Sequence, residues 1–160
     1  MGLYEKARQF AVEAHGSIGQ VRKYTGEPYH VHVLAVAALV ATRTTDEVVL
    51  AAACLHDVLE DVAPHNAGFS AERIREEFGE EVLGLVVELT DVYTTKNYPD
   101  LNRQTRKQRE AERLAQISER GKLIKRADLF DNARSIAGSE FAQVWMEEKR
   151  RLDEVLGRWE

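Results

Sequence analysis

The chain has 160 residues, of which 44% are hydrophobic and 31% are charged, and its formal charge at pH 7 is −5. This length suits one domain that buries roughly 70% of its unfolded surface. The ordinary composition excludes a low-complexity or disordered chain, and the negative charge argues against general nucleic-acid binding. The N-terminus lacks the apolar core of a signal peptide and no run is long enough to span a membrane, so we expect a cytoplasmic protein.

Apolar residues recur at helical spacing through nearly the whole chain, and no segment alternates as a strand would. Capping residues, glycines and prolines set the expected ends of the helices. The pattern predicts an all-α bundle of seven or eight helices around one core. The expected helices cover residues 3–15, 32–42, 44–61, 71–78, 80–92, 103–119, 122–137 and 139–159. The last of these should bury one apolar stripe, made of Phe141, Val144, Trp145, Leu152, Val155, Leu156 and Trp159.

The stretch "CLHDVLED", residues 54–61, ends the most apolar of these helices with four ionisable side chains. We interpret Cys54 as a small buried hydrophobe. On a helix, His56 and Glu60 share one face, and Asp57 and Asp61 share another. A lone His-Asp pair is weak evidence for a metal site. Four ionisable groups at the end of an apolar helix are costly unless they are paired or coordinated, which favours a functional site.

Two further segments carry polar groups at suggestive positions. In "KLIKRADLFDNARS", Asp128, Asn132 and Ser135 fall at i, i+4 and i+7, a polar stripe on a helix expected to bury Leu123, Ile124, Phe130 and Ile136. Surface solvation explains Asp128 poorly, because its neighbours are apolar. The loop "GQVRKYTGEPYHVH" combines the basic pair Arg22 and Lys23 with His30 and His32, of which one could be a ligand.

The negative charge is unevenly spread, because residues 96–126 contain ten basic and four acidic residues, a local charge of +6. One interpretation is a set of solvated helix faces. The other is an anion-binding wall, whose natural partner is a small molecule that carries phosphate.

Three segments in this order, "AHGSIGQVRKYTGEPYHVH", "LHDVLED" and "KLIKRADLFDN", resemble the HD-domain metal-dependent phosphohydrolases. More narrowly, they resemble the hydrolase domain of the RelA/SpoT alarmone enzymes and its stand-alone relatives, the small alarmone hydrolases such as the metazoan SpoT homologues. The resemblance extends from about residue 3 to residue 160. It implies one HD-domain helical bundle over residues 1–160, without a synthetase or regulatory domain.

Carried over residue by residue, the resemblance implies four metal ligands. These are His32, His56, Asp57 and Asp128, whereas His30 falls where the family is usually apolar. Two imidazoles and two carboxylates suit one Mn²⁺ ion, with iron or zinc as alternatives. A bound divalent ion lowers the pKa of water from about 15.7 towards 7.

The resemblance also implies roles for polar residues around the ligands. Glu60 and Asp61 match the acidic pair that activates or orients the attacking water. The implied substrate contacts are Arg22 and Lys23 in the nucleotide pocket, Asn132 and Ser135 at ribose or phosphate, Lys125 in a less defined role, and Lys96, Arg103 and Arg106 as a wall for pyrophosphate.

The implied reaction is hydrolysis of guanosine tetra- or pentaphosphate, (p)ppGpp, at the ribose 3′ position, which gives GDP or GTP and pyrophosphate. The chain departs from the family at Leu129, where a basic residue is usual, at Asp131, where an aromatic residue or histidine is usual, and at Val33, where proline is usual. These departures put phosphate contacts, and hence the choice of substrate, in doubt.

Other functions therefore stay open. The chain could be an HD phosphohydrolase for another nucleotide, such as the adenosine alarmone ppApp or a nucleotide with a 3′-phosphate. It could also be a non-catalytic alarmone sensor, although such a sensor should have lost a ligand or the acidic pair. A plain helical interaction module explains neither His32 nor Asp128. For partners we expect a small nucleotide and neither nucleic acid nor a membrane, and we leave homo-oligomer formation open.

Overall fold

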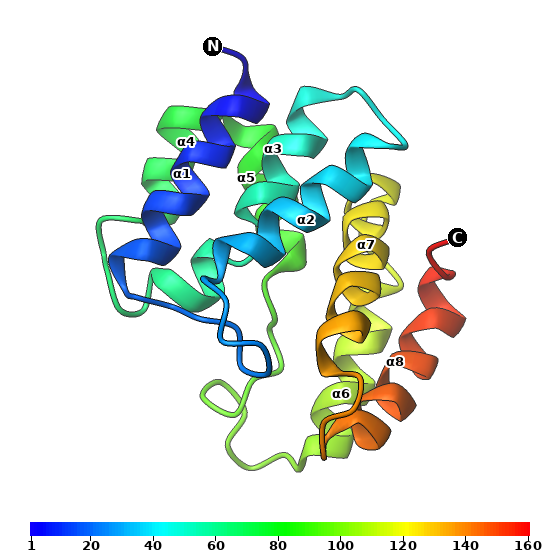
Figure 1. Cartoon of the computed structure of the whole chain (residues 1–160). Helices are drawn as coiled ribbons and strands as arrows, with labels where there is room; N and C mark the ends of the chain where they lie inside the picture. Colours follow the sequence, from blue (N-terminus) through cyan, green and yellow to red (C-terminus); the bar gives the residue numbers. More distant parts are fainter.

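The computed structural model describes all residues, 1–160, and consists of eight α-helices, one short π-helical segment and no strand (Figure 1). The only strand-like pairing is an isolated antiparallel bridge between Val21 and Pro28. The predicted all-α class with seven or eight helices is confirmed. In chain order the elements are α1 (Leu3–Ser17), α2 (His30–Ala41), α3 (Glu47–Leu55), the π-helical segment η1 (Val58–Val62), α4 (Ala71–Phe78), α5 (Glu80–Leu89), α6 (Arg103–Leu114), α7 (Glu119–Ile136) and α8 (Ala142–Leu156).

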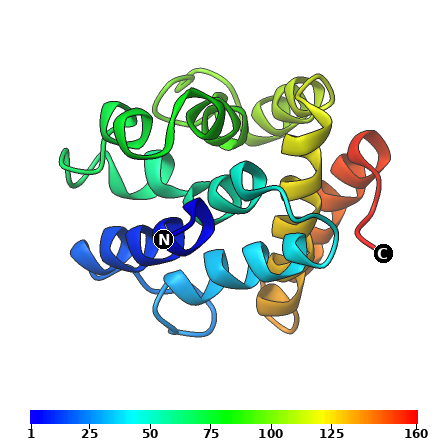
Figure 2. The same cartoon turned by 90° about the horizontal axis from the view of Figure 1, so that it is seen from above.

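Helix α3 forms the centre of the molecule and packs against α1, α2, α5 and α7 (Figure 2). Its sequence, "EVVLAAACL", is apolar on every face, as expected for a helix surrounded by others. Seven of its nine residues are buried, including Cys54, whose thiol is free. The side chain of Asp46 caps the helix by accepting a hydrogen bond from the Val48 amide. The buried helix α3 therefore ends at Leu55, directly before His56.

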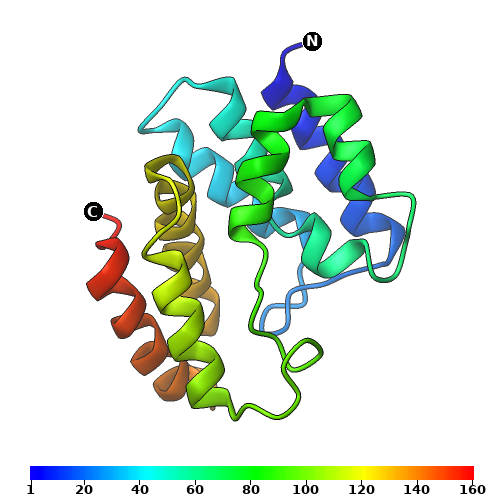
Figure 3. The same ribbon diagram turned by 180° about the vertical axis from the view of Figure 1, so that it is seen from behind.

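Most of the core lies on one side of the molecule. The main cluster of 27 buried hydrophobic residues draws on every element from α1 to α5, and α7 contributes Ile124 and Ala127. Helices α6 and α8 lie beside α7, on the side away from α1 (Figure 3). They bury a separate cluster of only three leucines, Leu114, Leu129 and Leu156.

Three predicted features of the helices are wrong. The helix expected over residues 44–61 ends at Leu55, and a π-helical turn replaces its last part. Of the stripe expected on the last helix, Leu156 is buried, but Val144 is 48% exposed and Val155 is 40% exposed. Phe130, expected in the core, is 38% exposed. Helix α8 packs against α6 and α7 alone, so a narrow line of contact covers only part of its apolar surface.

The two longest loops, residues 18–29 and 90–102, lie at the same end of the bundle (Figures 1 and 3). They frame the region where α3 ends and where α2 begins. None of the helices combines the length and the apolarity needed to cross a bilayer.

Candidate active site

The four residues predicted as metal ligands come together in one buried cluster. Each of His32, His56, Asp57 and Asp128 offers one ligand atom, and these atoms all lie within 4.8 Å of one another. His32 lies in the first turns of α2, His56 and Asp57 follow the last residue of α3, and Asp128 lies in α7. Because α2, α3 and α7 pack against each other, residues 96 positions apart in the sequence meet at this point.

Both imidazoles direct Nε2 at the same carboxylates. His32 Nε2 lies 2.9 Å from Asp128 Oδ1 and 3.7 Å from Asp57 Oδ2. His56 Nε2 lies 3.2 Å from each of these two oxygens. Two nitrogens and two oxygens that converge on one small volume form a donor set that fits a divalent cation. His30 is not part of the cluster.

The second nitrogen of each histidine also has a partner. His56 Nδ1 lies 2.6 Å from the Ala53 carbonyl oxygen, and His32 Nδ1 lies 2.8 Å from Asp131 Oδ2. A carbonyl oxygen can only accept, so the hydrogen of neutral His56 sits on Nδ1 and its Nε2 lone pair is available to a cation.

Two donors hold the carboxylates of the predicted ligands. The Tyr29 hydroxyl donates to Asp57 Oδ2 at 2.7 Å, and Lys125 Nζ donates to Asp128 Oδ2 at 2.9 Å. Burial would lower the pKa of Lys125, but the charges of Asp128 and Asp91 outweigh it and raise that pKa. Lys125, expected among the substrate contacts, is therefore engaged with a ligand carboxylate.

The ligand carboxylates are held in the ionised form. Burial alone would raise the pKa of Asp57, but the charge and hydrogen bond of His56 outweigh it and hold this pKa below its usual range. The pKa of Asp128 is likewise lowered well below its usual value, because Lys125 and the two histidines outweigh burial. The cluster thus presents anionic oxygens to a cation.

The acidic pair lies one turn further along, in η1. Glu60 Oε1 accepts a hydrogen bond from the Asp91 amide at 2.8 Å, and Asp61 Oδ2 accepts one from Gln20 Nε2 at 3.1 Å. Burial, with the charges of Asp91 and Asp57, raises the pKa of Glu60 to about 8. Burial and the charge of Asp57 raise the pKa of Asp61 to about 7. The pKa values of these two carboxyls are therefore raised, whereas those of the ligand carboxyls Asp57 and Asp128 are lowered.

A cavity of about 490 Å³ opens beside this cluster. Tyr29 lines the cavity and also holds Asp57, so it connects the two regions. Lys23 Nζ and the Arg103 guanidinium lie 5.9 and 5.0 Å from the centre of the Phe141 ring. Five of the predicted substrate contacts line this cavity: Arg22, Lys23, Arg103, Asn132 and Ser135.

The remaining basic residues do not form the expected wall. Lys96 is exposed in the loop after α5, and the Arg106 guanidinium donates to the Leu101 carbonyl, so neither lines the cavity. Arg113 pairs with Glu110 and donates to backbone carbonyls, while Arg120 pairs with Asp46 and Glu81. The charge of residues 96–126 is thus dispersed over separate helix faces and largely compensated there.

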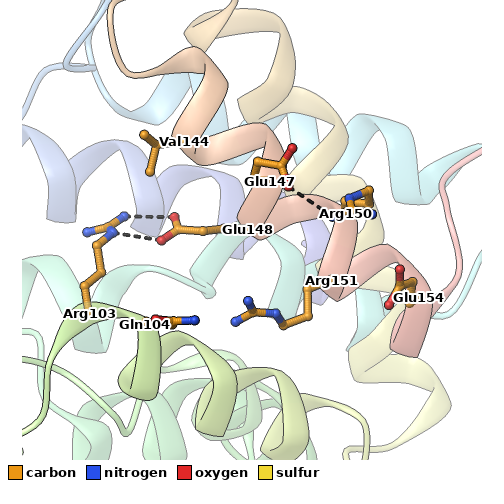
Figure 4. A pocket seen from close by; sticks show the side chains of 8 residues that line it. All are labelled: Arg103, Gln104, Val144, Glu147, Glu148, Arg150, Arg151 and Glu154. Atoms are coloured by element: carbon orange, nitrogen blue, oxygen red, sulfur yellow. Dashed lines mark hydrogen bonds and ion pairs between the residues drawn. The ribbon is translucent and has the colours of Figure 1, made fainter.

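A second cavity, of about 530 Å³, lies between α6 and α8 (Figure 4). Arg103 reaches its edge and forms a two-pronged ion pair with Glu148, at 2.8 and 2.9 Å. Arg150 pairs with Glu147 on the same helix. The lining of this cavity is mostly charged and includes two ion pairs, Arg103–Glu148 and Arg150–Glu147, but none of the cluster residues.

The departures from the family pattern have different structural outcomes. Leu129 packs with Leu114 and Leu156 in the smaller hydrophobic cluster, so it is directed away from the ligands. Val33 lies in the main core. Asp131 faces His32 and Arg22.

Sequence reasoning did not assign Gln20, Asp91 or Asp131 to the site. Gln20 and Asp91 contact the acidic pair across 41 and 31 positions, and no local pattern signals such contacts. Asp131 follows Asp128 by three positions on the same helix, so the spacing of α7 could have placed it on the same face.

Comparisons with known proteins agree with this arrangement. A family model described as an HD domain matches residues 7–153. The chain is 40% identical over 125 residues to guanosine-3′,5′-bis(diphosphate) 3′-pyrophosphohydrolase MESH1 of Drosophila melanogaster, a match that covers 77% of this chain and 63% of that protein. It is 36% identical over 138 residues to the Xenopus tropicalis protein of the same name, which covers 84% of this chain and 69% of that protein.

Among solved structures, the chain is similar to one described as a metazoan ortholog of SpoT that hydrolyzes ppGpp and plays a role in starvation responses. The TM-score is 0.80 and the identity 32%, over 98% of this chain and 86% of that chain. The chain thus matches just under two thirds of the length of its Drosophila relative and most of the solved one. The match to the family model, the curated relatives and the shared fold together show that the chain belongs to the HD-domain family, in the group that contains the MESH1 proteins.

Proposed function

We propose that this protein is a metal-dependent hydrolase that removes the 3′-diphosphate of guanosine tetra- or pentaphosphate as pyrophosphate and leaves GDP or GTP. The observation that carries the proposal is the buried cluster of His32, His56, Asp57 and Asp128, with its ligand atoms within 4.8 Å, next to a carboxylate pair of raised pKa. The activity named for the curated relatives supports the same reaction. We further propose that residues 1–160 act as one hydrolase domain, since the main core draws on α1 to α5 and on α7.

The proposed cofactor is one Mn²⁺ ion per site, with iron or zinc as alternatives, because the donor set mixes imidazole nitrogen and carboxylate oxygen. When bound, such an ion supplies Lewis-acid polarisation of a phosphoryl oxygen and a lowered pKa for water. Tyr29 and Lys125 would keep the two carboxylate ligands in place: Tyr29 donates to the Asp57 oxygen that faces the histidines, and Lys125 donates to the Asp128 oxygen that does not. Lys125 is on this view a positioning residue.

Glu60 and Asp61 are proposed to handle the proton of the attacking water. A carboxyl with a pKa near the working pH can accept a proton and later release it, and such a group contributes about 10²–10⁴-fold to the rate. The Asp91 amide fixes one oxygen of Glu60 and Gln20 fixes one oxygen of Asp61, so each carboxylate keeps its other oxygen available. We assign Glu60, which a backbone amide fixes, as the base and Asp61, which the Gln20 side chain fixes, as the group that orients the water.

The cavity beside Tyr29 is the proposed nucleotide pocket. Its 490 Å³ falls in the range of small-molecule sites, and it combines aromatic surface with basic side chains. Lys23, close to the Phe141 ring, offers positive charge for a phosphate, whereas Arg103 beside the same ring is paired with Glu148 and would have to exchange this partner for a phosphate. Asn132 and Ser135 offer hydrogen bonds to a ribose.

One assay tests the reaction. Purified protein with MnCl₂ is offered guanosine tetraphosphate, its adenosine counterpart and simple nucleoside monophosphates, and the released product is identified. Pyrophosphate from the guanosine tetraphosphate supports the proposal. Pyrophosphate from the adenosine compound alone would move the substrate to adenosine alarmones, and phosphate from monophosphates alone would contradict the proposed reaction. Tight binding without turnover would indicate a sensor.

The other expectations remain predictions. These are a cytoplasmic location, a small nucleotide as partner, no binding to nucleic acid or membranes, and an undetermined oligomeric state that sedimentation of the purified protein would establish.

A further inference from the structure

We propose that Asp131 is a positioning residue that fixes the His32 ring for metal binding and at the same time neutralises Arg22. The proposal rests on the metal site of the function proposed above, but it assigns a role to a residue at which this chain departs from the family pattern. It predicts that the affinity of the site for Mn²⁺ depends on the Asp131 carboxylate, which is not one of the four ligands.

The His32 ring lies between two carboxylates of the same helix. Asp128 Oδ1 lies 2.9 Å from Nε2 and Asp131 Oδ2 lies 2.8 Å from Nδ1. Residues three apart on α7 lie about one turn apart on one face, which lets both side chains reach the ring. All three side chains are buried, with exposed fractions of 0% for His32, 4% for Asp128 and 5% for Asp131. The contact to Asp131 is therefore shielded from water and is strong for a hydrogen bond of its type.

This contact supplies the acceptor that a ligating His32 needs. Both ring nitrogens face a carboxylate oxygen, and an ionised carboxylate can only accept, so a neutral His32 whose Nε2 holds a cation carries its hydrogen on Nδ1, where Asp131 accepts it. His56 has the same arrangement, with the Ala53 carbonyl as acceptor. A carboxylate as the outer partner also increases the basicity of the ligating imidazole. The two histidines thus differ in one respect: only His32 is oriented by a charged side chain.

The same carboxylate oxygen compensates a buried cation. Arg22 Nη2 lies 3.2 Å from Asp131 Oδ2, 3.3 Å from Asn132 Oδ1 and 3.0 Å from Ser135 Oγ. Arg22 is buried, so a guanidinium without this carboxylate would be an uncompensated charge. Because Nη2 also lies 3.3 Å from His32 Nδ1, loss of Asp131 would leave a cation beside the ring and disfavour a second cation at Nε2.

The test measures Mn²⁺ affinity by calorimetry on the full chain, without any substrate. Asp131→Asn keeps the size of the side chain and an acceptor oxygen but removes the charge. We expect it to weaken Mn²⁺ binding by about 10–100-fold, the usual effect of changing an outer partner of a ligating histidine. Asp153→Asn is the matched control, because Asp153 is a poorly exposed carboxylate on α8 that pairs with Lys149 and lies outside the cluster. The control should bind Mn²⁺ as the unmodified chain does.

A double variant, Arg22→Gln with Asp131→Asn, separates the two roles and also removes the unpaired buried cation that could prevent folding. Circular dichroism of the metal-free proteins checks that each variant folds. Affinity that stays low in the double variant supports orientation of His32 by Asp131. Affinity that returns to the original value would reduce Asp131 to a charge partner of Arg22 and overturn the proposal.

The remaining outcomes are also decisive. If the unmodified chain binds Mn²⁺ and Asp131→Asn binds it equally well, or if Asp153→Asn weakens binding to the same extent, the positioning role is wrong while the proposed metal site stands. If the unmodified chain binds no divalent ion, both the metal site and the positioning role fail.

Discussion

The two ionisable pairs of one short segment, His56–Asp57 and Glu60–Asp61, differ in what surrounds them. Asp57 lies 3.2 Å from His56 Nε2, and its pKa is held below its usual range. Glu60 and Asp61 are half-buried near other carboxylates, and their pKa values rise to about 8 and about 7. Groups whose surroundings push their pKa values apart are suited to different tasks. The first pair is suited to hold a cation, and the second to exchange a proton.

The backbone separates these two environments. Helix α3 ends at Leu55, and the next five residues after Asp57 form a π-helical turn, closed by a hydrogen bond from the Ala63 amide to the Val58 carbonyl. Val58 and Val62 are buried and anchor the turn, while Glu60 and Asp61 lie between them. Such turns are rare in proteins overall, and those that do occur are often found at functional sites. The Asp61 amide still donates to the Asp57 carbonyl at 2.9 Å, whereas the Glu60 side chain reaches the Asp91 amide.

The largest expected effect comes from Asp57→Ala. It removes one of the four ligands and leaves two buried histidines beside Asp128. We expect Mn²⁺ binding and hydrolysis to be lost together. The loss should exceed the roughly 100-fold that results at most from changing a residue that only hydrogen-bonds to a ligand. Calorimetry and the pyrophosphate assay measure the two losses. Full activity in a variant without bound metal would contradict the assignment of the first pair.

Glu60→Gln should separate the two pairs. Glutamine retains an oxygen that can accept from the Asp91 amide, so the local geometry should survive. We expect unchanged Mn²⁺ affinity and a kcat reduced by about 10²–10⁴-fold, the usual contribution of a general base, with little change in KM. Asp153→Asn serves again as the control that should change neither quantity. Normal turnover in Glu60→Gln would show that the second pair has no proton role.

The pH profile should sharpen the same comparison. A base works in its ionised form, so kcat should fall about tenfold per pH unit as the pH drops below the pKa of Glu60. Since a cation at the neighbouring ligands lowers this pKa, the midpoint should lie at or below about 8. The profile of Glu60→Gln should lack this limb. An identical limb in both proteins would assign it to another group.

The parts of the site that are local in sequence could be predicted, and those that depend on packing could not. The apolar run of α3 indicated a buried helix, and the expected start of α4 at residue 71 agrees with the cap before it, where the Ser70 hydroxyl accepts from the Arg73 amide. The resemblance to a family implied that His32 and Asp128 join the His56–Asp57 pair. No single segment of the sequence predicts this contact by itself. The contacts of Gln20 and Asp91 depend on how two loops meet, which the sequence does not express.

The errors in the last helix have a related cause. An apolar stripe predicts a buried face, but burial requires a neighbour that covers it. Helix α8 meets only α6 and α7, so Leu156 is covered while Val144 and Val155 remain at the surface. Helical periodicity shows which residues lie on the same face of a helix, but it does not show how many of them a neighbouring helix covers.

The smallest expected effect concerns the stability of the metal-free protein. The folded-state pKa of Glu60, about 8, exceeds the ordinary value of 4.5, so the folded state binds its proton more tightly than the unfolded state does. Stability from this group is therefore complete below pH 4.5 and decreases as the pH rises towards 8. Glutamine cannot ionise, so Glu60→Gln should stabilise the metal-free protein at pH 8 by about 1–4 kcal/mol, with roughly 2–4 °C in Tm for each kcal/mol. At pH 5 the two proteins should melt almost together. A variant that is less stable than the original chain at pH 8 would mean that the Glu60 carboxylate is well accommodated when charged. That result would remove the electrostatic difference between the two pairs. A higher Tm for Glu60→Gln at pH 8 would instead mean that the protein retains a destabilising carboxylate at the position where its proposed chemistry requires one.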